Sequence, residues 1–192
     1  MDPGADCAVP PFAAAVSDAL LPGTVVGEYL VEHKLGQGGM ATVYAARHPV
    51  IGKQAAVKVM PPALSADAGA VSRFVLEARA VNRIGHPNIV DVFSFGRLPD
   101  GRCCLVMEWL KGETLFERIW RQHGPLPLPE VVHILDEMCC ALEAAHHEGI
   151  VHRDLKPANV FLCADRRGQP RGKLLDFGGA ELLPTTLPPP TT

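Results

Sequence analysis

Residues 152–159 read HRDLKPAN, and the interpretation of the whole chain starts from them. The stretch follows a helical pattern and precedes the apolar run Val160–Leu162. A short loop between two buried elements rarely carries so many charged and polar residues, because each buried charge needs a partner or a metal ion. Asp154 can take a proton from an attacking hydroxyl, Lys156 can lie against phosphate oxygens, and Asn159 offers a carbonyl oxygen that suits magnesium. The stretch is therefore a candidate catalytic loop.

A second carboxylate occurs downstream, in the tripeptide DFG at residues 176–178. Asp176 directly follows an apolar pair, which places it where a strand is expected to end. Together the two stretches resemble the catalytic loop and the metal-binding motif of protein kinases, and the KPxN pattern resembles the serine/threonine branch. The resemblance implies that Asp154 orients the substrate hydroxyl and that Lys156 steadies the γ-phosphate of ATP. It also implies that Asn159 and Asp176 hold Mg²⁺.

A glycine-rich segment, GQGGMA at residues 36–41, lies between the strand-like runs Tyr29–Leu35 and Thr42–Ala46. Glycines let backbone amides approach phosphates closely, but the pattern alone also fits an ordinary hairpin. A dinucleotide-binding fold needs a helix after the glycines, whereas here a strand follows. The order resembles the kinase loop that covers ATP, with Ala41 in place of the third glycine. The resemblance implies a role in ATP binding for Gly36, Gly38 and Gly39.

Lys58 interrupts the apolar, strand-like run Ala55–Val59. A single lysine in a strand is usually a solvated edge residue, but in this position it resembles the kinase lysine that contacts the α- and β-phosphates. The family pairs that lysine with a glutamate on the next helix, which the sequence predicts over Val71–Ile84. Glu77 lies on the apolar face of this helix, where an unpaired carboxylate would be costly. We therefore expect Lys58 to pair with Glu77.

The resemblance also implies an adenine pocket. Met107 falls where kinases place the residue that guards this pocket, and residues 108–110 would form a hinge whose backbone groups bind the adenine edge. Outside the glycine loop and the Lys58–Glu77 pair, the residues expected to bind the nucleotide are Leu35, Val43, Ala56, Met107, Glu108, Leu110 and Phe161. From the sequence alone, the four that would sandwich the ring are equally compatible with ordinary core residues: Leu35, Val43, Ala56 and Phe161.

Composition narrows the class of protein. The chain has 192 residues, a hydrophobic fraction of 47% and a formal net charge of −3, which describes a globular protein without a strong basic field for nucleic acid. The N-terminus carries Asp2 and Asp6 where a signal peptide has positive charge, and no run of apolar residues is long enough to span a membrane. We therefore expect a cytoplasmic protein that binds neither nucleic acid nor a membrane.

The cysteines show no metal-binding spacing. None of the six forms a CxxC motif, and the adjacent pairs Cys103–Cys104 and Cys139–Cys140 lie within apolar patterns. We expect them to be small buried hydrophobic residues rather than metal ligands or disulfides.

The predicted fold class is α+β, a protein-kinase-like fold of two lobes. The first lobe would be an antiparallel sheet of five strands with one helix, and the second an incomplete helical lobe. The predicted boundaries are a flexible N-terminal segment at 1–24, the N-lobe and hinge at 25–110, a partial C-lobe at 111–183 and a Pro/Thr-rich tail at 184–192.

The resemblance stops after the DFG motif, because no activation segment, APE motif or later helices follow. We therefore expect a kinase interrupted at this point, with a long helix over Pro129–Glu148 that exposes Val132, Leu135, Met138 and Leu142. Such an apolar surface favours self-association or a protein partner.

The expected function is ATP- and Mg²⁺-dependent phosphoryl transfer to serine or threonine hydroxyls of an unknown protein substrate, impaired by the interruption. The alternatives are a nucleotide-binding module that does not catalyse transfer, an interaction fragment, or an unstable remnant.

Overall fold

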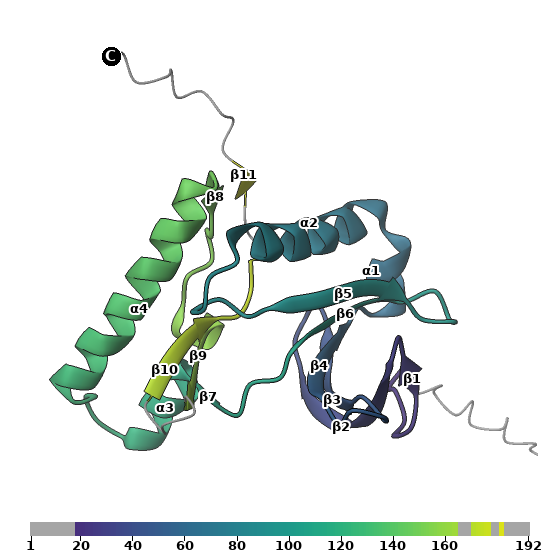
Figure 1. Ribbon diagram of the computed structural model, residues 1–192, viewed down its shortest axis with the longest axis horizontal. Coiled ribbons are helices and arrows are strands. Elements are labelled where there is room, and N and C mark those ends of the chain that lie inside the picture. The colour runs from purple at the N-terminus through teal and green to yellow at the C-terminus, as the bar shows by residue number, and fades with distance from the viewer. Residues whose placement is uncertain (1–17, 165–169, 178–180, 183–192) are drawn as a thin grey trace, which may run out of the picture.

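The computed structural model describes residues 18–164 and 170–177, together with the backbone of 181–182. Most of the predicted flexible segment 1–24, residues 165–169 and the predicted tail 184–192 lie outside the described residues. The described chain has a curled antiparallel sheet with helix α2 beside it, followed by a second part built around the long helix α4 (Figure 1).

One antiparallel sheet forms the first part, with the strand order β1-β2-β3-β4-β6-β5. The strands are β1 (Val25–Val26), β2 (Tyr29–Gln37), β3 (Thr42–Arg47), β4 (Gln54–Val59), β5 (Val92–Arg97) and β6 (Cys103–Glu108). The five predicted strands are confirmed as β2 to β6, and the two-residue strand β1 extends the sheet at its edge.

Successive side chains of β4 point alternately to the two faces of this sheet, one toward a core cluster and the other toward a cavity. Ala55, Val57 and Val59 are buried in a small core cluster inside the curl of the sheet. Because neighbouring side chains of a strand point to opposite faces, Ala56 and Lys58 face the other way. There they line a cavity that is described below.

Two helices lie between β4 and β5: the short α1 (Pro62–Ala66) and α2 (Ala68–Ile84). Helix α2 begins earlier than predicted because the side chain of Asp67 accepts a hydrogen bond from the backbone N–H of Ala70, which caps the helix. Gly85 ends it in the left-handed conformation, with φ of 57°. The buried face of α2 packs on the sheet and contributes Phe74, Ala78 and Val81 to the larger core cluster.

The second part contains α3 (Leu115–Gln122), α4 (Leu128–His147) and the one-turn helix η1 (Pro157–Asn159). Its strands are β7 (Gly112–Thr114), β8 (Ile150–Val151), β9 (Val160–Ala164), β10 (Pro170–Leu174) and β11 (Glu181–Leu182). They form a sheet of order β10-β9-β7 and a separate pair, β11-β8. The larger core cluster continues from α2 into α4, β9 and β10, so the two parts share one core.

The predicted exposure of α4 is right for two residues and wrong for one. Val132 and Leu135 are 57% and 58% exposed, whereas Met138 is only 4% exposed. Met138 is buried because Gly172 on β10 leaves room for it: a Cβ at Gly172 would lie 2.8 Å from the Cε atom of Met138. Leu142 is partly buried against the same core cluster.

The prediction for the cysteines is also wrong in part. Cys103 and Cys104 are buried, but Cys139 and Cys140 are exposed and Cys163 is half-buried. The two exposed cysteines lie away from the buried stripe of α4, which consists of Ile134, Met138, Ala141 and Ala145. All five described cysteines are free thiols. In the part of the chain that the structure describes, no helix has the length and apolar character needed to cross a membrane.

Candidate active site

A cavity of about 680 Å³ lies between the two parts and receives side chains from both. This volume is typical of small-molecule and cofactor sites. The predicted nucleotide residues that line it are Leu35, Gly36, Val43, Ala56, Lys58, Met107, Glu108, Leu110 and Phe161, and the predicted metal residue Asp176 lines it as well. Glu77 lies behind Lys58 and contacts the cavity through it.

The structure does not bring Gly38 and Gly39 to this cavity. They lie at the tip of the β2–β3 hairpin, where the N–H of Gly38 donates to the carbonyl of Ala41 at 2.9 Å. Both glycines line a separate cavity of about 320 Å³. Of the three predicted loop glycines, only Gly36 lines the larger cavity.

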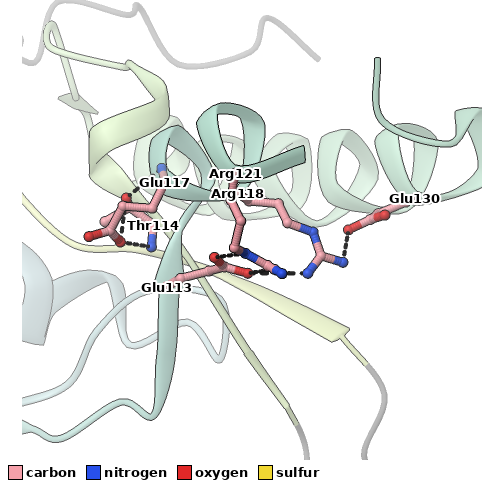
Figure 2. Close-up of polar contacts among 6 residues, drawn as sticks. All are labelled: Glu113, Thr114, Glu117, Arg118, Arg121 and Glu130. Carbon is pink, nitrogen blue, oxygen red and sulfur yellow. Dashed lines mark hydrogen bonds and ion pairs between the residues drawn. The ribbon is translucent and has the colours of Figure 1, made fainter. Parts of the chain in front are cut away.

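Trp109, which belongs to the predicted hinge at 108–110, also lines the cavity. Six further lining residues were not identified from the sequence: Val90, Lys111, Gly112, Thr114, Glu117 and Leu175. Two of these residues could have been identified from the sequence, because Thr114 and Glu117 have the S/T-x-x-E spacing of a capping box. In the structure the N–H of Glu117 donates to Thr114 Oγ1 at 3.1 Å, and the N–H of Thr114 donates to the Glu117 carboxylate at 2.7 Å (Figure 2). The box starts α3 at the mouth of the cavity.

A cluster of ion pairs holds α3 in place (Figure 2). Arg118 and Arg121 both pair with Glu113 on β7, at 3.1 and 2.6 Å. Arg118 also reaches Glu130 on α4 at 2.9 Å. Each of these pairs is partly exposed and contributes little stability alone, but together they fix α3 against β7 and α4. Helix α3 also packs against η1, which belongs to the candidate catalytic loop.

Lys58 joins two carboxylates that are far apart in the sequence. Its Nζ atom lies 2.7 Å from Oε1 of Glu77 and 3.3 Å from Oδ2 of Asp176. The side chains of Lys58 and Glu77 are only 15% and 8% exposed. The predicted pairing of Lys58 with Glu77 is therefore present, and it extends to the carboxylate that follows β10.

Burial and charge act on this cluster in opposite directions. Burial alone would lower the pKa of Lys58, but the nearby carboxylates of Glu77 and Asp176 outweigh it and leave that pKa above its ordinary value. Burial is the main influence on Glu77, and with the charge of Asp176 it raises the pKa of Glu77 to about 7 despite the attraction of Lys58. Lys58 therefore stays protonated at neutral pH, while Glu77 titrates there.

Asp154, Lys156 and Asn159 lie within hydrogen-bonding distance of one another. Lys156 Nζ is 2.6 Å from Oδ2 of Asp154, and Asn159 Nδ2 donates to the same oxygen at 3.1 Å. These hydrogen bonds, the one from Lys156 first, hold the pKa of Asp154 below its usual range. Asp154 and Lys156 are exposed to solvent and Asn159 is half-buried, so the ionised carboxylate of Asp154 is available as a proton acceptor.

His152 connects this loop to the DFG motif. The residue is 2% exposed, and the centroid of its ring lies 4.7 Å from that of the Phe177 ring. Burial lowers the pKa of His152, so the imidazole is neutral at pH 7. The contact positions the catalytic loop relative to Asp176, the residue before Phe177, and was not anticipated from the sequence.

The two residues expected to bind Mg²⁺ lie on neighbouring backbone segments. The N–H of Leu175 donates to the carbonyl of Asn159 at 3.0 Å, which places Asp176 beside the loop. Mg²⁺ typically takes one or two carboxylates together with substrate phosphates and waters, and an amide oxygen is a further suitable ligand. The pair Asn159 and Asp176 fits such a partial shell. Among the described residues no group of three or more His, Cys, Asp or Glu forms a metal cage of its own.

The sequence is similar to those of known proteins of one family. A family model described as "Protein kinase domain" matches residues 29–190. The chain is 43% identical over 180 residues to serine/threonine-protein kinase Pkn1 of Myxococcus xanthus, covering 93% of this chain and 25% of that protein. It is 37% identical over 164 residues to serine/threonine-protein kinase PknJ of Mycobacterium tuberculosis, covering 85% and 27%. The chain thus spans about a quarter of the length of these curated relatives.

The fold is similar to a solved structure as well. The crystal structure of the Mycobacterium tuberculosis PknI kinase domain superposes with a TM-score of 0.72 at 34% sequence identity. The match covers 83% of this chain and 63% of the PknI chain.

Proposed function

The chain belongs to the protein kinase family, and we propose that it transfers the γ-phosphoryl group of ATP to serine or threonine hydroxyls of a protein. One observation carries the proposal. Lys58, paired with Glu77 and Asp176, lines the same cavity as the hinge. A nucleotide in this cavity would lie with its phosphates beside Lys58 and its base against the segment that begins at Glu108.

The apolar lining supports binding of the base. Leu35, Val43 and Ala56 come from β2, β3 and β4, and Phe161 comes from β9 in the second part. A planar ring between them would be covered from both parts, with Met107 at the inner end and backbone groups of 108–110 at its edge.

The polar residues support the transfer step. Asp154, held ionised by Lys156 and Asn159, would accept the proton of the substrate hydroxyl and orient its oxygen toward the γ-phosphate. Lys156 would keep the phosphate in place, and positioning of this kind provides most of the catalysis in phosphoryl transfer. Asn159 and Asp176 would hold Mg²⁺, which neutralises charge on the phosphates when it is bound.

The rival function is nucleotide binding without transfer, and the test separates the two. The intact chain is incubated with radiolabelled ATP, Mg²⁺ and a generic basic protein substrate, alongside Asp154→Asn. We expect transfer of labelled phosphate that disappears in the variant. Equal labelling in both proteins, with ATP binding retained, would support the binding module instead.

We also propose two properties of the protein as a whole. The exposed residues Val132 and Leu135, with Leu128 near the start of α4, form an apolar surface that favours self-association or a protein partner. Sedimentation of Leu135→Ser at several concentrations tests this, because the variant should remain monomeric where the native chain associates. A cytoplasmic location accords with dependence on ATP and with the free thiols of the described cysteines.

A further inference from the structure

An ion pair at the edge of the nucleotide cavity joins the two parts of the molecule at the hinge. Lys173, on β10, has its Nζ atom 2.6 Å from Oε2 of Glu108, the last residue of β6. The two residues are 65 positions apart in the sequence, and their side chains are 13% and 31% exposed. Lys173 Nζ also donates to the carbonyl of Ile89 at 3.4 Å.

The Glu108 carboxylate has a second partner, in the segment that leads into β5. The N–H of Asp91 donates to Glu108 Oε2 at 3.4 Å, and the N–H of Glu108 donates to the carbonyl of Asp91 at 2.8 Å. The same segment is joined to β10 by backbone hydrogen bonds. The N–H of Val90 donates to Leu174 at 2.9 Å, and the N–H of Leu174 donates to Asn88 at 2.8 Å. Residues 88–91 and β10 are thus already hydrogen-bonded to each other, and the ion pair of Lys173 with Glu108 joins the hinge to them.

Lys173, unlike Glu108, lies away from direct nucleotide contact. Lys173 and Glu108 line a cavity of about 690 Å³, and Lys173 does not line the nucleotide cavity. Glu108 and Trp109 line both cavities, so the hinge is the wall between them. Any influence of Lys173 on a bound nucleotide must therefore act through the hinge.

We propose that Lys173 is a positioning residue that holds the hinge at a fixed distance from the DFG segment through its ion pair with Glu108. The inference rests on the proposed function, because it assigns Lys173 to the same nucleotide site. Lys173 shares its strand with Leu174, and Asp176 lies two residues after the end of that strand. The pair therefore couples the backbone that would bind adenine to the carboxylate that would hold Mg²⁺.

The physical effect is preorganisation. A nucleotide in the cavity contacts both parts, so it binds more tightly when the two parts are already held in the bound arrangement. Removing one partner of a largely buried ion pair leaves the other charge poorly solvated and frees the hinge. We expect ATP affinity to fall about tenfold, which corresponds to about 1.4 kcal/mol.

The experiment compares Lys173→Met with Lys173→Arg, Glu108→Gln and the double variant Lys173→Met/Glu108→Gln. Lys53→Met is the matched control, because Lys53 lines the same cavity and its ammonium lies 3.7 Å from the centre of the Phe93 ring instead. The first measurement is amide hydrogen exchange at residues 108–112 without nucleotide. The second is Mg-ATP affinity by calorimetry, and the melting temperature of each variant shows that it is folded.

We expect Lys173→Met and Glu108→Gln to speed exchange at the hinge and to weaken ATP binding about tenfold, with no further loss in the double variant. Lys173→Arg should retain most of the affinity, and Lys53→Met should behave like the native chain. Unchanged hinge exchange in Lys173→Met and Glu108→Gln would overturn the inference. So would a full additional loss of affinity when Lys173→Met is added to Glu108→Gln.

The two proposals fail in different ways. If the native chain binds no ATP, the proposed function fails, and hydrogen exchange at the hinge still decides whether the ion pair positions it. If the native chain binds ATP, and Lys173→Met matches it in hinge exchange and ATP affinity, the proposed function stands and the positioning role is wrong.

Discussion

Replacing Lys58 with methionine is the most direct test of the candidate site. The substitution keeps the length of the side chain and removes the charge that lies 2.7 Å from Glu77 and 3.3 Å from Asp176. A charge-assisted hydrogen bond to a phosphate contributes about 1.5–3 kcal/mol. Lys58→Met should therefore weaken Mg-ATP binding by roughly ten- to 150-fold.

The same substitution has a second, independent consequence for stability. Glu77 remains buried next to Asp176, and its pKa is already raised to about 7 by burial. Without Lys58 the ionised form of Glu77 loses its attractive partner, so Lys58→Met should lower the melting temperature. Adding Glu77→Gln removes the stranded charge, and the double variant should be more stable than Lys58→Met alone.

The assay is calorimetric titration with Mg-ATP at pH 7, combined with thermal unfolding of each variant. Glu77→Gln should bind ATP better than Lys58→Met, because Lys58 keeps its contact with Asp176. Lys53→Met serves as a control for loss of a positive charge elsewhere on the sheet. Affinity of Lys58→Met within about twofold of the native value, which is under 0.5 kcal/mol, would refute the assignment of Lys58 to the phosphates.

Three further predictions concern pH, packing and magnesium. The pKa of Glu77 is raised from 4.5 to about 7, so the folded state binds more protons than the unfolded state between these pH values. The free energy of unfolding should therefore fall as pH rises through this window. Chemical denaturation at several pH values should show this slope, and the slope should be smaller in Glu77→Gln. Gly172→Ala should destabilise the fold by less than the roughly 1–3 kcal/mol typical of overpacking, because the Met138 Cε atom that the added Cβ would meet at 2.8 Å is the end of a flexible side chain and can turn aside. Denaturant titrations check this, and a loss of more than about 3 kcal/mol would contradict it. Removing Mg²⁺ with EDTA should weaken ATP binding in the native chain and have a much smaller effect in Asp176→Asn; an equal effect in both would contradict the metal assignment.

The sequence alone determined those parts of the site that depend on the order of residues within a motif and on the periodicity of side chains along a strand or helix. The HRDLKPAN and DFG stretches are short enough that a few bonds fix where their side chains lie. The alternation along β4 placed Lys58 on the face opposite Val57, and the helical period of α2 placed Glu77 on its buried face. Both residues had to find partners on the covered side, which is why their pairing was predictable.

Tertiary structure decided what covers each face and which distant segments meet. Met138 is buried in the core cluster that α4 shares with β9 and β10, next to Gly172, and no pattern within α4 contains that information. Gly38 and Gly39 lie away from the main cavity because the turn closes on Ala41. The contact of Lys173 with Glu108 joins residues 65 positions apart. The period of a strand or helix states which side chains share a face, whereas the partner of that face depends on how the whole chain packs.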